Sequence, residues 1–237
     1  MKRIAITGGK GTIGTVLAKG LRDSLEITIL DYPDCDVKEL GRLVEAVRGH
    51  DVVIHLAWDI KIENGERSGQ VESGKISPDN SLMTYNVYEA ALTSKVPRVI
   101  MASSVHADRY TRWDRPELMS PYRLPEPNDP YGASKDFMEA LGRYYVSKYK
   151  RPEVVCIRFG GVNRENDPHR EDSIYPAVWF SHRDCVSLVR TCIEASSIPN
   201  GYAIVYGISN NTTRLHDYSN PLGWKPQDDS SIARSPA

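Results

Sequence analysis

Short apolar runs alternate with amphipathic stretches along most of the chain. Runs of strand length, rich in β-branched residues, lie at residues 2–7, 26–30, 51–57, 98–104, 153–159 and 203–206. Apolar residues at helical spacing lie at residues 16–21, 36–48, 80–95, 131–149 and 181–193. The run at 51–57 is apolar on both faces, which is typical of a strand covered by helices on both sides. This alternation predicts an α/β fold around a parallel sheet.

Three segments interrupt the alternation. Asp36 follows the run at 26–30 so closely that a full third strand has little room, and we expect that part of the sheet to be abbreviated. Residues 58–79 are polar and contain several Gly and Ser, which predicts a mobile loop over a pocket. Residues 105–130 carry five prolines and also predict a loop.

Composition and charge narrow the class of protein. The 237 residues are 40% hydrophobic and 26% charged, with a formal net charge of -1. These values are typical of a globular protein and give no general affinity for nucleic acid or anionic membranes. No apolar run approaches the roughly 20 residues of a membrane span, and the N-terminus does not resemble a signal peptide. The four cysteines lack CxxC or metal-ligand spacing, so we expect reduced, mostly buried thiols, no metal site and a cytoplasmic location.

A glycine-rich turn, GxxGxxG, lies between the first predicted strand and helix. Gly8 permits the tight turn, Gly11 the close approach of a pyrophosphate, and Gly14 the packing of helix on strand. Backbone N–H groups at the start of the helix, around Thr12 and Ile13, would hold the phosphates. The motif predicts a Rossmann-type doubly wound sheet that binds a dinucleotide.

An acidic residue ends the second predicted strand. Asp31 lies about 20 residues after the glycines, the distance at which a carboxylate hydrogen-bonds the adenosine ribose hydroxyls. A carboxylate there repels a 2′-phosphate, so NAD is favoured over NADP. The alternative is a turn-forming Asp before Tyr32 and Pro33. Asp36, beside Val37, is either the N-cap of the next helix or a group near the adenine, or both.

Other candidates lie at the carboxyl ends of predicted strands, where parallel sheets bind ligands. Leu56 and Ala57 end the strand at 51–57, and Ser103 and Ser104 end the strand at 98–104. We expect Leu56, Ala57 and Ser103 to border the cofactor, and both serines to be in the right place for chemistry, although serines commonly end strands for local reasons. His55, inside its strand, is more typical of a satisfied core residue than of a ligand.

Tyr131 and Lys135 place a phenol and an ammonium four residues apart. On a helix both side chains lie on one face. A nearby ammonium favours a phenolate, and lowering a tyrosine pKa by three units takes about 4 kcal/mol. A tyrosine tuned in this way exchanges a proton near neutral pH. The alternative is a stacked surface pair.

The combination of these motifs resembles the short-chain dehydrogenase/reductase superfamily. Residues 7–14 resemble the TGxxGxxG form of its extended branch, the NAD-dependent epimerase/dehydratase family. Five further blocks resemble uronate dehydrogenases and are similar to NAD-dependent glucose-6-phosphate dehydrogenases of the superfamily, which oxidise the anomeric carbon of a free sugar to a lactone. These blocks are residues 102–106, 141–145, 179–184, 206–209 and 222–226.

The resemblance implies roles for individual residues. Tyr131 would be the proton acceptor, and Lys135 would hold the nicotinamide ribose and lower the Tyr131 pKa. Ser104 would hydrogen-bond the reacting oxygen. Asn80 would complete a proton path through water, and His106 would contact the substrate.

Three positions depart from the uronate dehydrogenase pattern. Val105 replaces an Asn, Gly161 replaces a Ser, and Ile174 lies near the position of an Arg that binds the substrate carboxylate. Arg170 or Arg164 is then the candidate replacement for that Arg.

The sequence therefore predicts an NAD-dependent oxidoreductase acting on a hexuronate or a hexose phosphate. Residues 1–160 would form the NAD-binding core, and residues 161–237 a small substrate-binding lobe interleaved with the last core helix and strand. Helices 80–95 and 131–149 would pair in a homodimer, as in related enzymes. One alternative is a nucleotide-sugar epimerase or dehydratase with tightly bound NAD, which the short C-terminal region disfavours. Another is a non-catalytic NAD-binding sensor, which has no need of the Ser-Tyr-Lys set.

Overall fold

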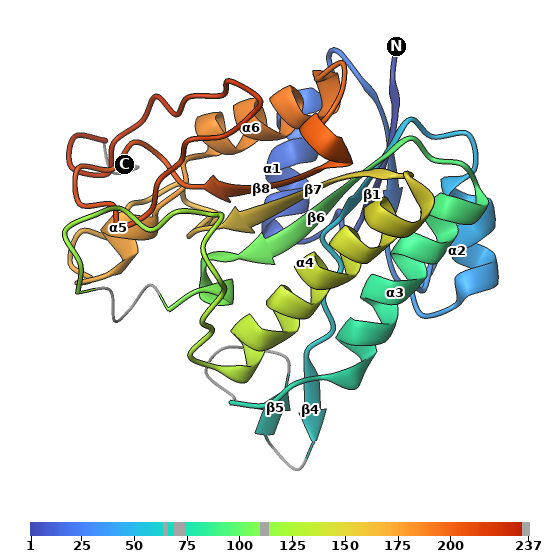
Figure 1. Ribbon diagram of the computed structural model, residues 1–237, viewed down its shortest axis with the longest axis horizontal. Helices are drawn as coiled ribbons and strands as arrows, with labels where there is room; N and C mark the ends of the chain where they lie inside the picture. The colour runs from blue at the N-terminus through green and yellow to red at the C-terminus, as the bar shows by residue number, and fades with distance from the viewer. Residues whose placement is uncertain (64–65, 69–73, 110–113, 234–237) are drawn as a thin grey trace.

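A six-stranded parallel sheet forms the centre of the protein (Figure 1). The computed structural model describes residues 1–63, 66–68, 74–109 and 114–233. The strand order is β2-β1-β3-β6-β7-β8, and every pairing is parallel. The predicted Rossmann-type α/β fold is confirmed. The strands are β1 (Arg3–Thr7), β2 (Glu26–Leu30), β3 (Val52–His55), β6 (Arg98–Ser104), β7 (Glu153–Phe159) and β8 (Tyr202–Gly207).

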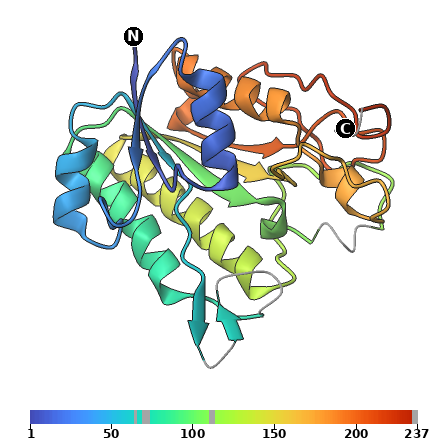
Figure 2. The same cartoon turned by 180° about the vertical axis from the view of Figure 1, so that it is seen from behind.

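Helices cover both faces of the sheet, as the apolar strands require (Figures 1 and 2). One face carries α1 (Thr12–Leu21) and α6 (His182–Glu194). The other carries α2 (Leu40–Val47), α3 (Pro78–Thr93) and α4 (Pro130–Tyr149). Alternate residues of one strand therefore belong to different cores: Ile4 and Ile6 pack with α1 and α6, and Ala5 packs with α2 and α3.

The segment between β2 and α2 contains no strand, which confirms the expected abbreviation of the sheet. The predicted start of the following helix at Asp36 is wrong. The Asp36 carboxylate accepts the Lys38 N–H at 2.9 Å and closes a local turn, so that the helix begins only at Leu40 behind Glu39.

Residues 58–79 are more regular than predicted. The backbone of Lys61–Glu63 (β4) pairs antiparallel with Glu66–Ser68 (β5), a short hairpin that the sequence analysis did not predict inside this loop. The predicted mobility also concerns residues 64–65 and 69–73, which lie outside the described residues. In the segment 105–130 a single 3-10 turn, η2 (Val105–Ala107), follows β6, and residues 110–113 lie outside the description.

The chain after Phe159 joins the layers already described. It adds α5 (Tyr175–Val178), α6, η4 (Pro199–Gly201) and β8, and then a long C-terminal segment. That segment is held against α6 because the Asp184 carboxylate accepts the N–H groups of Gln227 and Asp228, both at 2.9 Å. A separate substrate lobe over residues 161–237 stays a prediction.

All four cysteines are buried and free, as expected for reduced thiols. No helix in the described part of the chain is long and apolar enough to cross a bilayer. The cytoplasmic location stays a prediction.

Candidate active site

The glycine-rich turn brings the ends of three strands together. Gly8, with φ +68°, follows β1 and donates its N–H to Leu30 at the end of β2 at 3.0 Å. A Cβ at Gly8 would lie 2.5 Å from the Ala57 nitrogen beyond β3. A Cβ at Gly14 would lie 2.5 Å from the Cα of Gly9. The sequence therefore needs glycine at both positions, since any side chain would force the turn and α1 away from the sheet.

Helix α1 begins with an open N-terminus at this turn. Gly11 is its N-cap residue, has extended backbone angles and provides no side chain to cap the helix. The first N–H groups of α1 therefore point outward without a capping side chain, which is the arrangement that binds phosphate in dinucleotide folds.

A cavity of about 450 Å³ opens beside the turn, over the ends of β1, β2 and β3. Asp31 is fixed in its wall, because its carboxylate accepts the Lys10 N–H at 2.8 Å and the Tyr32 N–H at 3.0 Å. The predicted cofactor residues in this wall are Gly8, Gly11, Asp31, Asp36, Val37, Leu56 and Ala57.

A second cavity of about 300 Å³ lies on the other side of the turn. It shares Gly8, Gly11, Leu56 and Trp58 with the first cavity, so the two form neighbouring parts of one groove. Its lining brings together the predicted residues Thr12, Ile13, Gly14, Ser103, Ser104, Tyr131 and Lys135.

Lys135 is the buried cation of this second cavity. Its side chain reaches from α4 across to β6, where Nζ donates to the Ala102 carbonyl at 2.8 Å. Nζ also lies 3.4 Å from the centroid of a Trp58 ring and 5.4 Å from the centroid of the Tyr131 ring. Burial lowers the pKa of Lys135 to about 7. The carbonyl and the indole face favour the protonated form, since both interact with positive charge.

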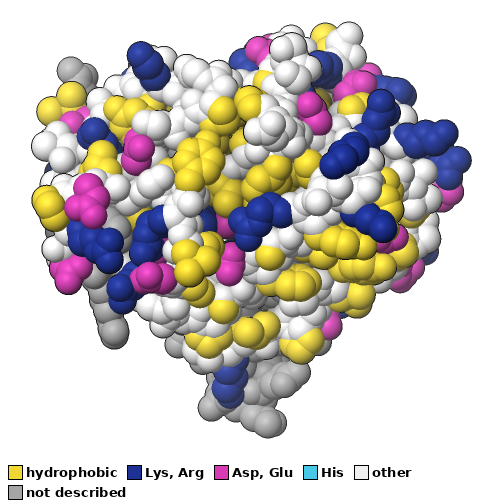
Figure 3. Space-filling view, in the orientation of Figure 1, with side chains coloured by type: hydrophobic (Ala, Val, Ile, Leu, Met, Phe, Trp, Pro, Cys, Tyr) yellow, Lys and Arg dark blue, Asp and Glu magenta, His cyan; other side chains and the backbone are white. Residues whose placement is uncertain are grey.

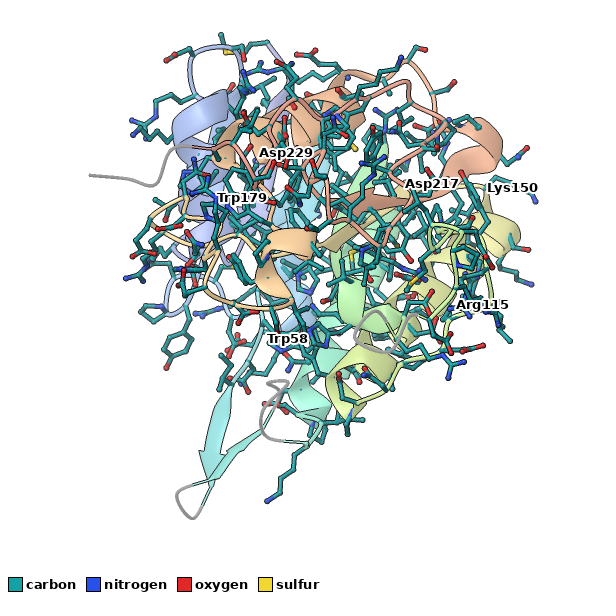
Figure 4. All side chains as sticks on the ribbon, turned by 90° about the vertical axis from the view of Figure 1, so that its left-hand side faces the viewer. Trp58, Arg115, Lys150, Trp179, Asp217 and Asp229 are labelled. Atoms are coloured by element: carbon teal, nitrogen blue, oxygen red, sulfur yellow. The ribbon has the colours of Figure 1, made fainter. Side chains whose placement is uncertain are left out.

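Trp58 is a site residue that the sequence analysis did not identify. It lies where the chain leaves β3 towards the β4–β5 hairpin (Figure 4) and packs edge-to-face on Tyr131, with ring centroids 5.6 Å apart. Asn80 holds the adjoining backbone: its side-chain oxygen accepts the Asp59 N–H at 2.6 Å and its amide donates to the Asp59 carbonyl at 2.8 Å. Both ends of the Asn80 amide therefore position the Trp58 segment.

Ser104 lines the same cavity as Tyr131, and His106 packs on Tyr131. The Ser104 hydroxyl accepts the His106 N–H at 3.2 Å at the start of η2. The His106 and Tyr131 rings pack edge-to-face, with centroids 5.6 Å apart. The Nδ1 of His106 lies 2.9 Å from a carboxylate oxygen of Asp129, the N-cap residue of α4. His106 itself lines neither cavity, but its side chain keeps 17% of its surface exposed.

Ser103, which lines the second cavity, hydrogen-bonds to a buried pair of opposite charges, Glu139 and Arg158. The Ser103 hydroxyl donates to the Glu139 carboxylate at 2.5 Å, and Arg158 of β7 donates to the same carboxylate twice, at 2.8 Å each. Glu139 and Arg158 are fully buried. A charge inside the apolar run of β7, and a carboxylate one turn after Lys135 on the same helical face, were the signals in the sequence that could have identified them.

Two further predictions concern arginines. Arg170 donates to the Ser230 carbonyl at 2.7 Å and also to Ala233, and it lines neither cavity. Arg164 lines a separate groove between α1 and α6. The structure therefore does not bring either guanidinium into the groove formed by the two cavities.

His55 is a core residue, as predicted. It is buried in β3, where its Nδ1 lies 2.8 Å from the Thr7 hydroxyl, and its Nε2 has no hydrogen-bond partner among the residues that the structure describes. Burial, and secondarily the Lys135 charge, lower the pKa of His55 to about 3, so that the ring stays neutral.

Comparison with known proteins identifies the family. Residues 4–178 match the NAD-dependent epimerase/dehydratase family. The chain belongs to this family. The family assignment made from the sequence is confirmed, and with it the NAD cofactor and the enzyme class.

Three curated relatives are dehydrogenases of sugars. An L-arabinose 1-dehydrogenase (NAD(P)(+)) of Haloferax volcanii is 32% identical over 98% of both chains. A uronate dehydrogenase of Agrobacterium fabrum is 31% identical over 99% of this chain and 88% of its own. An NAD-dependent glucose-6-phosphate dehydrogenase of Haloferax volcanii is 31% identical over 96% of this chain and 94% of its own.

Solved structures agree with the sequence relatives. Uronate dehydrogenase from Agrobacterium tumefaciens superposes with a TM-score of 0.80 at 31% identity, covering 98% of this chain and 86% of that one. A tyrosine-to-alanine mutant of the same enzyme complexed with NAD also gives a TM-score of 0.80, at 30% identity and with the same coverage. The chain thus falls among the sugar dehydrogenases of the family.

The residues of the groove fit NAD. The turn at Gly8 leaves no space for a side chain, α1 presents an uncapped N-terminus, and the Asp31 carboxylate stands in the wall of the first cavity. A pyrophosphate, with a ribose beside Asp31, suits these groups in charge and in size.

Proposed function

We propose that this protein oxidises the anomeric carbon of a sugar to a lactone, with NAD as cofactor, at Ser104, Tyr131 and Lys135. One observation carries the proposal: a phenol, an ammonium and a strand-end hydroxyl line one cavity beside the glycine turn of an NAD-binding fold. The names of the relatives, which act on arabinose, uronate and glucose 6-phosphate, support a sugar as the substrate. A hexuronate or a hexose phosphate is the substrate that the sequence favours.

The groove would hold NAD along its length. Asp31 would accept hydrogen bonds from the adenosine ribose, and the N–H groups of Thr12 and Ile13 would bind the pyrophosphate. Lys135 would donate to the nicotinamide ribose. Bound NAD supplies the hydride acceptor.

The protein's own residues would handle the proton. Ser104 would hold the oxygen of the anomeric hydroxyl, and Tyr131 would take its proton as the carbon is oxidised. The ammonium of Lys135, held by the Ala102 carbonyl, favours the phenolate form of Tyr131. Trp58, packed on both Lys135 and Tyr131, keeps water away from the pair and so strengthens their interaction.

The test is NADH formation over a panel of hexuronates, hexose phosphates and free aldoses, with purified protein and added NAD. We expect NADH with at least one sugar, and loss of turnover with intact NAD binding in Tyr131→Phe. Tyr122→Phe is the matched control, because this tyrosine is exposed and lines neither cavity.

Other outcomes identify the alternatives. Substantial turnover by Tyr131→Phe removes the proton acceptor from the scheme. NAD that co-purifies with the protein, together with no net NADH from any free sugar, indicates a nucleotide-sugar epimerase or dehydratase. Reversible NAD binding without turnover over the whole panel indicates a sensor.

We also propose a homodimer through the predicted helices at 80–95 and 131–149, which correspond to α3 and α4. Large apolar side chains are exposed along these helices (Figure 3), including Tyr85, Phe137 and Tyr144, which are 44%, 42% and 50% exposed. Burying such a surface in a partner stabilises the assembly. Sedimentation should give a dimer mass that falls to a monomer mass in Phe137→Glu; a wild-type monomer at all concentrations contradicts the proposal.

A further inference from the structure

Asp129 joins two elements of the site through the two oxygens of one carboxylate. One oxygen accepts the Gly132 N–H at 2.7 Å and so caps α4, the helix that carries Tyr131. The other oxygen lies 2.9 Å from the Nδ1 of His106 in η2. Asp129 and His106 are each 17% exposed at the side chain, so the pair is sheltered but reaches the surface.

Close packing also holds η2 against the first turn of α4. A Cβ at Gly132 would lie 1.9 Å from the His106 carbonyl oxygen, so only glycine lets η2 sit on the first turn of α4. The same η2 segment donates the His106 N–H to Ser104. Ser104, His106 and Tyr131 are therefore held together by one short stretch of backbone and one carboxylate.

The chemistry of the carboxylate decides the position of a proton. An ionised carboxylate only accepts hydrogen bonds, so the Nδ1 atom facing Asp129 must carry hydrogen. In the neutral ring, Nε2 is then the atom with the acceptor lone pair.

We propose that Asp129 is a positioning residue: it fixes His106 as the Nδ1–H tautomer, so that Nε2 accepts a hydrogen bond from a sugar hydroxyl next to Tyr131. The part of this inference that concerns the sugar rests on the proposed function.

A consequence concerns the class of group recognised at His106. An acceptor lone pair, backed by the negative charge of Asp129, attracts a hydroxyl and repels a carboxylate or phosphate oxygen. The sugar group that meets His106 is therefore a hydroxyl, and any anionic substituent of the substrate binds elsewhere.

Three substitutions at Asp129 distinguish its role as the cap of α4 from its effect on the tautomer of His106. In Asp129→Asn the side-chain oxygen still caps Gly132, and the amide N–H₂ then faces Nδ1 and forces the proton to Nε2. Asp129→Ser keeps a cap but loses the histidine partner, and Asp129→Ala loses both. Asn and Ser should leave the melting temperature close to that of the wild type, whereas Ala should lower it by about 2–6 °C.

Activity is measured as kcat/KM on the best sugar of the panel. Asp129→Asn should lose about 10- to 100-fold, because Nε2 then donates to the hydroxyl oxygen, and the hydroxyl hydrogen loses the acceptor that directs it. Asp51→Asn, at the amino ends of the strands and so on the far side from the site, is the carboxylate-to-amide control and should keep the wild-type kcat/KM.

A double-mutant cycle tests whether Asp129 acts through His106. His106→Phe keeps a ring against Tyr131 but removes both nitrogens, and in that background Asp129→Asn should cost less than twofold. An equal loss in both backgrounds, or a wild-type kcat/KM in Asp129→Asn, overturns the proposal.

Nitrogen NMR of the histidine ring reads the tautomer without any substrate. We expect hydrogen on Nδ1 of His106 in the wild type and on Nε2 in Asp129→Asn. The same tautomer in both proteins overturns the proposal, whether or not a sugar is oxidised. The expected tautomer change in a protein that oxidises no sugar keeps the Asp129 role and refutes the proposed function alone.

Discussion

Lys135 should make the stability of this protein depend on pH in a way that its replacement by methionine removes. Lys135 is 4% exposed, and burial lowers the pKa of its ammonium from the ordinary value of 10.5 to about 7. Between these two pH values the unfolded chain holds a proton that the folded protein has released. Stability therefore rises with pH through this window, and the cost of burying the charge is fully present below it.

The size of the effect follows from the pKa difference. A fall from 10.5 to about 7 spans about 3.5 pH units, or about 5 kcal/mol at roughly 1.4 kcal/mol per unit. This is the upper limit, because the Ala102 carbonyl and the Trp58 ring favour the charged form. Lys135→Met has similar volume and no charge. The difference in unfolding free energy, variant minus wild type, should be constant below pH 7 and fall by about 1.4 kcal/mol per unit above it.

Urea unfolding at a series of pH values from about 6 to about 9.5 measures this difference. Between pH 7.5 and 9.5 it should fall by about 2.5 kcal/mol. Lys148→Met, on the exposed part of the same helix, should give a difference that does not change with pH. The comparison is repeated in the Tyr131→Phe background to remove any contribution of the phenol. A difference for Lys135→Met that is equally flat over the whole range refutes the reasoning.

Three further substitutions test the groove and its support. Asp31→Ser should lower the ratio of kcat/KM for NAD to that for NADP by about 10- to 100-fold, since the carboxylate no longer repels a 2′-phosphate; an unchanged ratio counts against the ribose contact. Gly8→Ala should lower stability by about 2–4 kcal/mol and abolish the rise in melting temperature that NAD causes, because the new Cβ meets Ala57 at 2.5 Å and the backbone has φ +68°. Glu139→Gln should lower the free energy of unfolding by about 3 kcal/mol in denaturant titrations, because Arg158 loses the charged partner of two hydrogen bonds and keeps only the Asp108 carboxylate at 3.7 Å; a change below about 1 kcal/mol would contradict the charge pair.

The parts of the site that the sequence predicted are those with short-range causes. The glycine turn depends on a motif of seven residues, and Tyr131 and Lys135 lie only about one helical turn apart. The apolar strands were readable because parallel strands are buried on both faces. The start of α2 was misplaced because Asp36 has two local uses, and the turn at Lys38 competes with the cap.

The sequence by itself determined the sheet, the dinucleotide turn and the cofactor residues predicted at the ends of the strands, which line the groove. Only the tertiary structure decided that Trp58 covers Lys135, that Asp129 holds His106, and that Arg170 binds the C-terminal segment. Each of these contacts joins residues separated by 23 positions or more, from elements with no common periodicity. Such pairs carry no local signature, because their distance is set by how the layers pack on the sheet rather than by the spacing along the chain.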